Sequence, residues 1–407
     1  MGLRVLILSQ YFWPENMRIN DLSEELSNRG YHVTVLTGVP NYPEGHVYPE
    51  YVSNPARFNK YNGSVDIIRV PMLTRGNGRL RLALNYLSFL ISASTFGVWK
   101  LRRKSIDLVF FYGISPITSA IPGVFIARLK NAKLFLWILD LWPETIEALG
   151  ILKKGILLRV LTGAIKWIYD HTDCILINSR AFEESVRSVC AGNPANIRYF
   201  PSWAESVFDG ELISSSRSST TFDIVFAGNI GESQDFMTLI RGFELLKNDK
   251  SIKFRIAGDG RFLSQVRTEL AARGLDNVEL LGRLPLEQMP TLFSQADALL
   301  LSLKADDVFS RAVPAKLFAY LAAGKPILAV IGGESARIIY EAGAGFACDS
   351  GDYRQFVKNV VKLKQMDASA RSLLGAKGRA HYLDHFRKDR IFDQLEKLLE
   401  QPRFIRN

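Results

Sequence analysis

Short apolar runs that alternate with helical patterns, twice over in one chain, are the feature that most constrains the fold. The first half predicts strands at Leu3–Leu8, His32–Leu36, Asp107–Phe111, Lys133–Ile138 and Asp173–Ile177. The second half predicts strands at Phe222–Phe226, Lys253–Ala257, Asn277–Leu280, Ala298–Leu301 and Pro326–Ala329. Continuous apolar runs are typical of parallel strands that are covered on both faces. The sequence therefore predicts an α/β protein with two doubly wound parallel sheets.

A serine-rich stretch over residues 202–221 is the best candidate for a linker between the two halves. The chain has 407 residues, and single cores stop growing near ~250–300 residues. We therefore expect Rossmann-like domains over residues 1–201 and 222–385, with a cleft between them. A helix is expected near the C-terminus, and residues 386–407 are expected to pack back on the first domain. Ligands of such sheets bind at the carboxyl ends of the strands.

Charge and composition narrow the partners. The formal net charge is +10, which favours a phosphate-bearing or anionic partner. Seven Lys or Arg and no acid lie between Arg75 and Lys104, and they bracket the uncharged run Leu82–Trp99 (residues 82–99). This run is slightly short and too polar for a confident membrane span. Two interpretations stay open: a core helix with basic ends, or a helix that lies on an anionic membrane surface.

Neither the cysteines nor the N-terminus suggests export. The three cysteines lack C-x-x-C spacing, so we expect reduced thiols and no zinc site. Met1–Ser9 enters a strand without a secretory leader pattern. We expect a cytoplasmic protein, peripheral on the inner face of the plasma membrane, with no nucleic-acid partner because no recognition module accompanies the charge. His381 and His385 are four residues apart but have no clear carboxylate partner, so no metal is expected.

A glycine turn opens the second half. Gly228-Asn-Ile-Gly231 follows a strand and precedes a helix. Such a turn exposes backbone N–H groups and the positive end of a helix to a phosphate. The simpler interpretation is that any tight strand-to-helix turn needs glycine.

A second signal is the helix that begins near Pro314 and ends at Gly324. Lys316 lies in its first turn, where a cation gains nothing from the helix dipole. It is therefore a candidate to neutralise a diphosphate, and the alternative is a surface lysine.

In the first half, Asp140 ends an apolar strand and precedes Trp142-Pro-Glu144. A carboxylate at that end of a strand is well placed to orient an acceptor hydroxyl or to take its proton. The alternative is a helix N-cap. Glu15, after Pro14, has the same two interpretations.

These motifs together resemble family 4 glycosyltransferases. The resemblance rests on Ala-Gly-Asp-Gly260, Leu-Gly-Arg283, Lys316-Leu-Phe-Ala-Tyr-Leu-Ala-Ala-Gly-Lys-Pro-Ile327, Tyr-Phe-Trp-Pro-Glu15 and Pro40-Asn-Tyr-Pro43. It covers nearly the whole chain, and the last phrase is similar to a bacterial branch that includes N-acetyl-L-fucosamine transferases.

The resemblance implies the GT-B fold and a retaining transfer that needs no metal or other cofactor. Its donor would be a nucleoside-diphosphate sugar in the second domain. Expected donor contacts are Gly228, Asn229, Gly231, Gln234, Arg283, Arg311 and Pro314. Expected acceptor contacts are Glu15, Asn41, Tyr42, Trp142 and Glu144, with Asp140 and Lys316 as catalytic residues. Arg311 and Ala319 stand where the family often has glutamates, so the usual ribose contact is absent or supplied elsewhere.

The expected function is a hexosyltransferase that moves a sugar, such as an acetamido sugar, from UDP to a lipid-diphosphate-linked acceptor. The expected products are bacterial surface polysaccharides: lipopolysaccharide O-antigen, capsule or colanic acid. Two alternatives stay open: a nucleotide-sugar epimerase of the same fold, and a non-catalytic partner subunit of a transferase.

Overall fold

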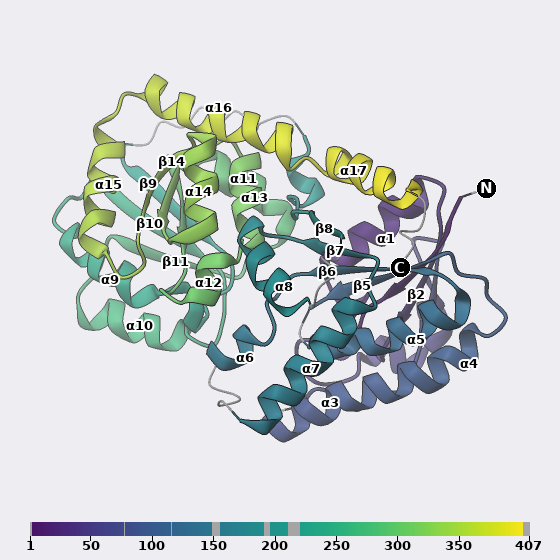
Figure 1. The fold of residues 1–407 in the computed structure, drawn as a ribbon. Helices are drawn as coiled ribbons and strands as arrows, with labels where there is room; N and C mark the ends of the chain where they lie inside the picture. Colours follow the sequence, from purple (N-terminus) through teal and green to yellow (C-terminus); the bar gives the residue numbers. More distant parts are fainter. Residues whose placement is uncertain are drawn as a thin grey trace. The chain divides into compact units, whose positions relative to one another are not determined.

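The protein divides into two compact units, each with one sheet (Figure 1). The computed structural model describes residues 2–76, 78–114, 116–148, 155–190, 196–210 and 220–401. Unit 1 comprises Met1–Asn178, Phe182–Phe200 and Glu400–Asn407, and unit 2 comprises Ser179–Ala181 and Pro201–Leu399. Residues 211–219 of the expected linker lie outside the described residues. The expected domain limits, and the packing of residues 386–407 on the first domain, stay predictions.

Unit 1 is built on a sheet of eight strands, in the order β3-β4-β2-β1-β5-β6-β7-β8. The strands are β1 (Arg4–Leu8), β2 (His32–Thr37), β3 (Lys60–Tyr61), β4 (Val65–Arg69), β5 (Leu108–Gly113), β6 (Lys133–Ile138), β7 (Cys174–Ile177) and β8 (Asn196–Tyr199). All neighbours pair in parallel except β3 and β4. Strand order reverses between β1 and β5, which is the point where such sheets bind ligands.

Helices cover this sheet, and α3, α5 and α7 gather on one side of it in Figure 1. The helices of unit 1 are α1 (Arg18–Asn28), α2 (Pro49–Ser53), α3 (Arg79–Ser92), α4 (Val98–Leu101), α5 (Ile121–Lys130), α6 (Glu144–Ala148), α7 (Ile156–Asp170) and α8 (Glu183–Val189). A π-helical turn at Ala93–Gly97 joins α3 to α4. The uncharged run noted in the sequence is therefore one nearly continuous helical segment.

Unit 2 is built on six parallel strands, in the order β11-β10-β9-β12-β13-β14. The strands are β9 (Phe222–Ala227), β10 (Ile252–Ala257), β11 (Val278–Gly282), β12 (Ala298–Ser302), β13 (Ile327–Val330) and β14 (Gly345–Cys348). Its helices are α9 (Phe236–Leu245), α10 (Leu263–Ala272), α11 (Met289–Ser294), α12 (Asp307–Arg311), α13 (Ala315–Ala322), α14 (Gly333–Ala342), α15 (Tyr353–Gln365), α16 (Ala368–His385) and α17 (Lys388–Glu400). Strand order reverses between β9 and β12, so their carboxyl ends form the ligand-binding point of this sheet.

The core of unit 2 shows why these runs form a two-sided sheet. Every residue of β9 and of β12 is buried, as expected for strands that are covered on both faces. Phe243 of α9 is fully buried and packs on Phe254 of β10, with ring centroids 4.1 Å apart. Phe356 of α15 packs on the same pair. The expectation of two doubly wound parallel sheets is confirmed.

Replacing Phe243 with alanine should destabilise unit 2 by about 3–5 kcal/mol, because the ring leaves a cavity that rigid neighbours cannot close. Leu245, on the same helix, is 57% exposed. Leu245→Ala is therefore the matched control and should change stability by less than about 0.5 kcal/mol. Urea unfolding of both variants measures the difference, and equal effects would contradict this description of the core.

Candidate functional site

Two turns at the carboxyl ends of the strands of unit 2 pack tightly against each other. Gly228 follows β9 with φ +137°, a conformation that only glycine adopts without strain. A Cβ on Gly258, after β10, would lie 1.9 Å from the Gly228 carbonyl oxygen. The Ile230 amide donates to the Asp259 carbonyl over 2.8 Å. The two turns can approach this closely only without side chains, and Gly228 and Asn229 stay exposed on the outer side.

Lys316 of α13 reaches this same turn. Its Nζ donates to Gln234 Oε1 over 2.6 Å and lies 4.1 Å from the centroid of the Phe226 ring. A Cβ on Gly228 would lie only 3.0 Å from the Lys316 Nζ. Pro314 is the N-cap of α13, so the tip of that helix and the glycine turn meet. The structure thus brings the two sequence motifs together, and their role in binding a donor stays a prediction.

The charge of Lys316 is poorly compensated. Burial lowers the pKa of its ammonium group to about 7. Within the part of the chain that the structure describes, no carboxylate lies within ion-pair distance of this nitrogen. A partly buried cation that has a neutral amide partner but no opposite charge raises the free energy of the folded protein, and a bound anion would relieve that cost. The site therefore favours an anionic ligand.

A buried hydroxyl ties α13 to the end of β9. The Tyr320 hydroxyl accepts a hydrogen bond from the Ala227 amide over 2.9 Å and contacts the carbonyl oxygen of the same residue at 3.2 Å. Tyr320 is fully buried, and its neighbour Ala319 is almost fully buried. The small side chain at Ala319 offers no polar group to a ligand, so any ribose contact comes from another residue.

Other expected donor residues lie along the same edge. Arg283 is exposed directly after β11, and Gly258 donates to the Gly282 carbonyl over 2.8 Å. Gly231 packs against the Asn229 side chain, since a Cβ there would lie 2.6 Å from Asn229 Nδ2. Lys304, after β12, was not among the residues expected from the sequence. Its backbone amide donates to Ser233, and its ammonium group lies 2.9 Å from Glu232.

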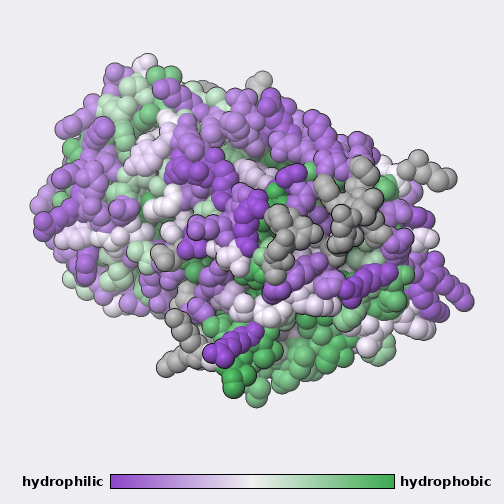
Figure 2. All heavy atoms as spheres, in the orientation of Figure 1, coloured by the Kyte–Doolittle hydropathy of each residue, from purple (hydrophilic) through white to green (hydrophobic). Residues whose placement is uncertain are grey.

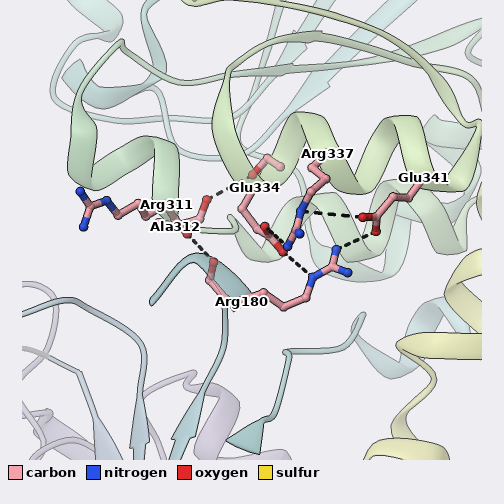
Figure 3. A network of polar contacts seen from close by, with 8 residues as sticks. Arg180, Arg311, Ala312, Glu334, Arg337 and Glu341 are labelled. Atoms are coloured by element: carbon pink, nitrogen blue, oxygen red, sulfur yellow. Dashed lines mark hydrogen bonds and ion pairs between the residues drawn. The ribbon is translucent and has the colours of Figure 1, made fainter. Parts of the chain in front are cut away.

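Arg311 lies at the end of α12, beside a network of polar contacts (Figure 3). The Ser179 hydroxyl donates to the Arg311 carbonyl oxygen, and the Ser335 hydroxyl donates to the Ala312 carbonyl oxygen. In Figure 3 the Arg311 guanidinium points away from Glu334. The network therefore holds the backbone before Pro314.

Buried Glu334 organises this network. Its carboxylate accepts from Arg180 Nε over 2.8 Å and also pairs with Arg337. Arg180 reaches Glu341 as well, over 2.7 Å. Glu334 lies in the first turn of α14, where the helix dipole also stabilises a carboxylate. Sequence reasoning missed this network because Arg180 lies 154 positions away from Glu334 in the chain.

In unit 1, the Glu15 carboxylate holds two loops together through hydrogen bonds. Its carboxylate accepts from the backbone amides of Phe12, Asn41 and Tyr42 over 2.7–2.9 Å. Burial raises its pKa to about 7, while the three amides and Arg69 pull the pKa down. Both carboxylate oxygens are thus engaged, and Glu15 positions the loop at residues 41–42.

Asn41 belongs to the same group of hydrogen bonds between loops. Its side chain donates to the Val39 carbonyl over 2.8 Å and accepts from the Arg75 amide over 2.9 Å. Asn41 is fully buried, so it holds the loop after β2 against the loop after β4. Sequence reasoning placed Glu15 and Asn41 in one site, but it could not show that backbone amides would engage both side chains.

Polar side chains lie against the ring of Tyr42. Its ring lies 5.1 Å from the ring of Tyr11 and 5.2 Å from the Arg75 guanidinium. Burial raises the pKa of Tyr86 on α3; the charge of Arg75 opposes this rise, while Tyr42 and Asp140 add to it. Asp140 follows β6, at the carboxyl end of the strands of the unit 1 sheet. Arg75 and Tyr86 were not among the residues expected from the sequence.

Trp142 and Glu144 follow Asp140. Trp142 is buried, whereas Glu144 begins α6 and is half-buried. Among the described residues, Glu144 Oε2 is buried without a hydrogen-bond partner. The roles expected for Asp140, Trp142 and Glu144 stay predictions. The described residues contain no group of three or more His, Cys, Asp or Glu side chains that could hold a metal ion.

Two sequence families match the chain in succession. Residues 16–203 match the family described as Glycosyl transferase 4-like domain, and residues 221–365 match Glycosyl transferases group 1. The chain therefore carries the two domains of a glycosyltransferase. Together with the two parallel sheets, the structural neighbours below give the GT-B fold.

Two curated proteins are similar over most of the chain. Probable glycosyltransferase WbjE of Pseudomonas aeruginosa is 28% identical over 71% of this chain and 74% of its own length. Putative colanic acid biosynthesis glycosyl transferase WcaI of Escherichia coli K12 is 25% identical over 79% of this chain and 82% of its own length.

Among solved structures, Anabaena HepE in complex with UDP-glucose has a TM-score of 0.68 and 14% identity, over 98% of this chain and 99% of its own. Sucrose-phosphate synthase from Thermosynechococcus elongatus has a TM-score of 0.71 and 14% identity, over 97% and 98%. The expected GT-B fold is confirmed. The N-acetyl-L-fucosamine branch stays a prediction.

The lowered pKa of Lys316 predicts a specific pH dependence of stability. Between about pH 7 and about pH 10.5 the unfolded chain binds a proton here that the folded chain lacks, so stability rises with pH. The wild type should gain stability relative to Lys316→Met between about pH 7 and about pH 9. Urea unfolding of both proteins at the two pH values gives the difference, and a difference independent of pH would contradict the burial of this charge.

Proposed function

We propose that the protein is a retaining hexosyltransferase that moves a sugar from a UDP-sugar to a lipid-diphosphate-linked acceptor. The observation that carries the proposal is the meeting of Lys316, Gln234 and the Gly228 turn. Lys316 has no carboxylate partner among the described residues, and it lies next to exposed backbone where the strand order of a parallel sheet reverses. This combination suits a diphosphate. The two glycosyltransferase domains support transfer over other nucleotide chemistry.

In the proposed reaction, the bond from the anomeric carbon to the diphosphate breaks and a bond to the acceptor oxygen forms on the same face. Lys316 and the Gly228 turn stabilise the negative charge that develops on the leaving diphosphate. The acceptor proton passes to the departing diphosphate. This route needs neither a protein nucleophile nor a metal.

Unit 1 would supply the acceptor contacts in this proposal. Asp140 follows β6 at the carboxyl end of the strands of unit 1 and would orient the acceptor hydroxyl. Arg75 is a candidate contact for an acceptor phosphate, and the Tyr42 ring is a candidate platform for a sugar. Glu15 and Asn41 would act indirectly, by holding the loop that carries Tyr42.

The donor proposal predicts that Lys316→Met weakens UDP binding by at least about tenfold, because one charge-assisted contact to the diphosphate is lost. Lys362 offers a matched control, since its ammonium group lies 4.3 Å from the Phe346 ring, much as Lys316 lies over Phe226. Lys362→Met should leave UDP affinity unchanged. Titration calorimetry measures both, and equal affinities in the two variants would remove Lys316 from the site.

A product assay tests the reaction itself. The wild type is incubated with UDP-, GDP- and dTDP-sugars and a lipid-diphosphate sugar acceptor, and products are scored by mass. The expected outcome is transfer from a UDP-sugar, with an acetamido sugar such as N-acetyl-L-fucosamine as the proposed donor group. Interconversion of UDP-sugars without acceptor would favour an epimerase. UDP binding without any transfer would favour a non-catalytic partner subunit, an outcome that Arg311 and Ala319 make worth testing.

The relatives guide the proposed pathway. One curated relative is described as a colanic acid biosynthesis glycosyl transferase. We therefore propose a role in bacterial surface polysaccharide synthesis, of the O-antigen, capsule or colanic acid kind.

A lipid acceptor requires access to a membrane, and unit 1 offers an apolar surface for it. Exposed apolar side chains line α3, α4, α5 and α7: Leu80, Leu84, Leu87, Ile91, Trp99, Phe125, Leu129, Ile156, Leu157 and Val160. Figure 2 shows apolar residues gathered over α3 and α7. Exposed Arg102 and Arg103 follow α4, and Arg102 lies 4.2 Å above the Trp99 ring. Apolar contact flanked by cations is typical of helices that lie on anionic membranes.

The segment Leu80–Leu101 is long and apolar enough to cross a membrane, but its contacts favour a position in the interface. Asn85 and Phe89 are fully buried against the rest of unit 1. The Asn85 side chain accepts from Gln10 over 2.8 Å and contacts the Tyr11 hydroxyl at 2.9 Å. Insertion across a bilayer would break these bonds. We therefore propose a cytoplasmic protein, peripheral on the inner face of the plasma membrane.

Leu87→Glu should reduce binding to phosphatidylglycerol-containing vesicles by at least about tenfold, since it removes an apolar contact and adds a repelled charge. Leu245 is similarly exposed, at 57% against 52% for Leu87, but belongs to unit 2. Leu245→Glu is therefore the matched control and should bind as the wild type does. Vesicle flotation measures both, and equal flotation of the two variants would contradict this membrane surface.

A further inference from the structure

A cavity lies in unit 2 at the amino ends of the strands, whereas the Gly228 turn lies at a carboxyl end. Its volume is about 440 Å³. Its wall includes Ala296 and Asp297, which precede β12, and Lys325 and Pro326, which precede β13. These are the amino ends of parallel strands, whereas Gly228 follows a carboxyl end. The cavity is therefore separate from the candidate donor site.

Three cationic side chains line this cavity: Lys325, Arg371 and Arg379. Backbone carbonyls hold each of them in place. Lys325 donates to Ser294 over 2.7 Å, and Arg379 donates to Gly210 over 2.9 Å and also to Ala322. Arg371 donates to the carbonyl oxygens of Lys364 and Met366. Carbonyls fix the positions of these cations but do not neutralise their charge.

The spacing of α16 explains why both arginines face the cavity. Arg371, Gly375 and Arg379 recur every four residues, so they lie along one face of the helix. A Cβ on Gly375 would lie 2.0 Å from the Gly324 carbonyl oxygen. Gly375 thus lets the helix touch the turn before β13, with one arginine on each side of the contact.

The cavity keeps an excess of positive charge. Asp297 is its one acidic lining residue, and one oxygen of that carboxylate already accepts from the Asp223 amide over 2.9 Å. In the described part of the chain, no ion pair joins Arg371 or Arg379 to a carboxylate. An anion that enters the cavity would therefore meet two guanidinium groups, Arg371 and Arg379, that no carboxylate of the described residues pairs with.

One wall of the cavity is apolar. Val207, Phe208 and Pro290 contribute to it, and the Phe208 ring stacks on Phe293 with centroids 5.5 Å apart. A rigid aromatic surface beside fixed cations suits a ligand that combines a ring with a phosphate. The volume falls in the range of about 300–1,000 Å³ that is typical of small-molecule sites.

We propose that this cavity is a second anion site, which binds a phosphorylated small molecule through Lys325, Arg371 and Arg379. The organic part of the ligand packs on Phe208 and Pro290. This site stands independently of the proposed transferase reaction, because it shares no residue with the Gly228 turn or with Lys316.

Hydrogen exchange of the full-length protein with glucose 1-phosphate, and in parallel with pyrophosphate, tests the proposal. The expected result is slower exchange in residues 320–327 and 366–380, with an apparent Kd at least about tenfold weaker in Arg371→Gln and in Lys325→Gln. Lys358→Gln removes an exposed lysine of α15 that does not line the cavity and should match the wild type. Thermal melting confirms that each variant is folded, and Lys325→Gln carries the test if Arg371→Gln does not fold.

Protection of residues 228–234 and 314–317 reports the donor site in the same experiment. Lys316→Met should abolish that protection and leave the protection of residues 366–380 unchanged, so the two proposals fail separately. No protection of residues 320–327 and 366–380 at millimolar ligand would overturn the second site. Protection that Arg371→Gln and Lys325→Gln leave unchanged would also overturn it, as would protection by phosphatidylglycerol vesicles but by neither soluble phosphate.

Discussion

The close contact between the turns after β9 and β10 is the constraint on which the donor side of this protein depends. Gly258 lets its turn lie directly against the Gly228 carbonyl, and the Ile230 amide then reaches Asp259. This contact fixes the chain that leads into Gln234, and Gln234 in turn orients the ammonium group of Lys316. A side chain at Gly258 would displace all of these groups together, because each is placed by the one before it.

A buried carboxylate holds loops in each unit. Glu15 is 2% exposed and gathers three backbone amides in unit 1, whereas Glu334 is 4% exposed and pairs with two arginines in unit 2. Burying a charge is costly unless hydrogen bonds or an opposite charge compensate it, and both residues meet that condition. Their role is to position the loops that carry candidate ligand contacts, rather than to touch a ligand.

Much of the fold could be predicted because parallel strands that are buried on both faces leave continuous apolar runs. The prediction of β6 matches the structure residue for residue, and the prediction of β9 ends one residue short. By contrast, β4 was not predicted, because Asp66 and Arg69 interrupt its apolar pattern near the edge of the sheet. The short strands β8 and β14 were also missed, since Asn196 and Arg198 in β8, and Gly345 in β14, weaken their apolar runs.

The candidate site was predictable in part. Lys316 was predicted to contact a diphosphate because a cation is unfavourable in the first turn of a helix. The structure places it at the glycine turn. Its partner Gln234 lies 82 residues away, and such pairings depend on the tertiary fold. Arg75 and Tyr86 join Tyr42 for the same reason.

Helix α13 connects the candidate donor site with the proposed second anion site. Lys316 lies in the first turn of α13, and Ala322, in the last turn, lines the cavity of the proposed second anion site. The eight residues of α13 span only about 12 Å, so the two anion sites lie at opposite ends of one short, rigid helix. If ligand binding at one end shifts this helix and thereby changes the affinity at the other end by some factor, thermodynamic reciprocity requires that the second ligand change the affinity for the first by the same factor.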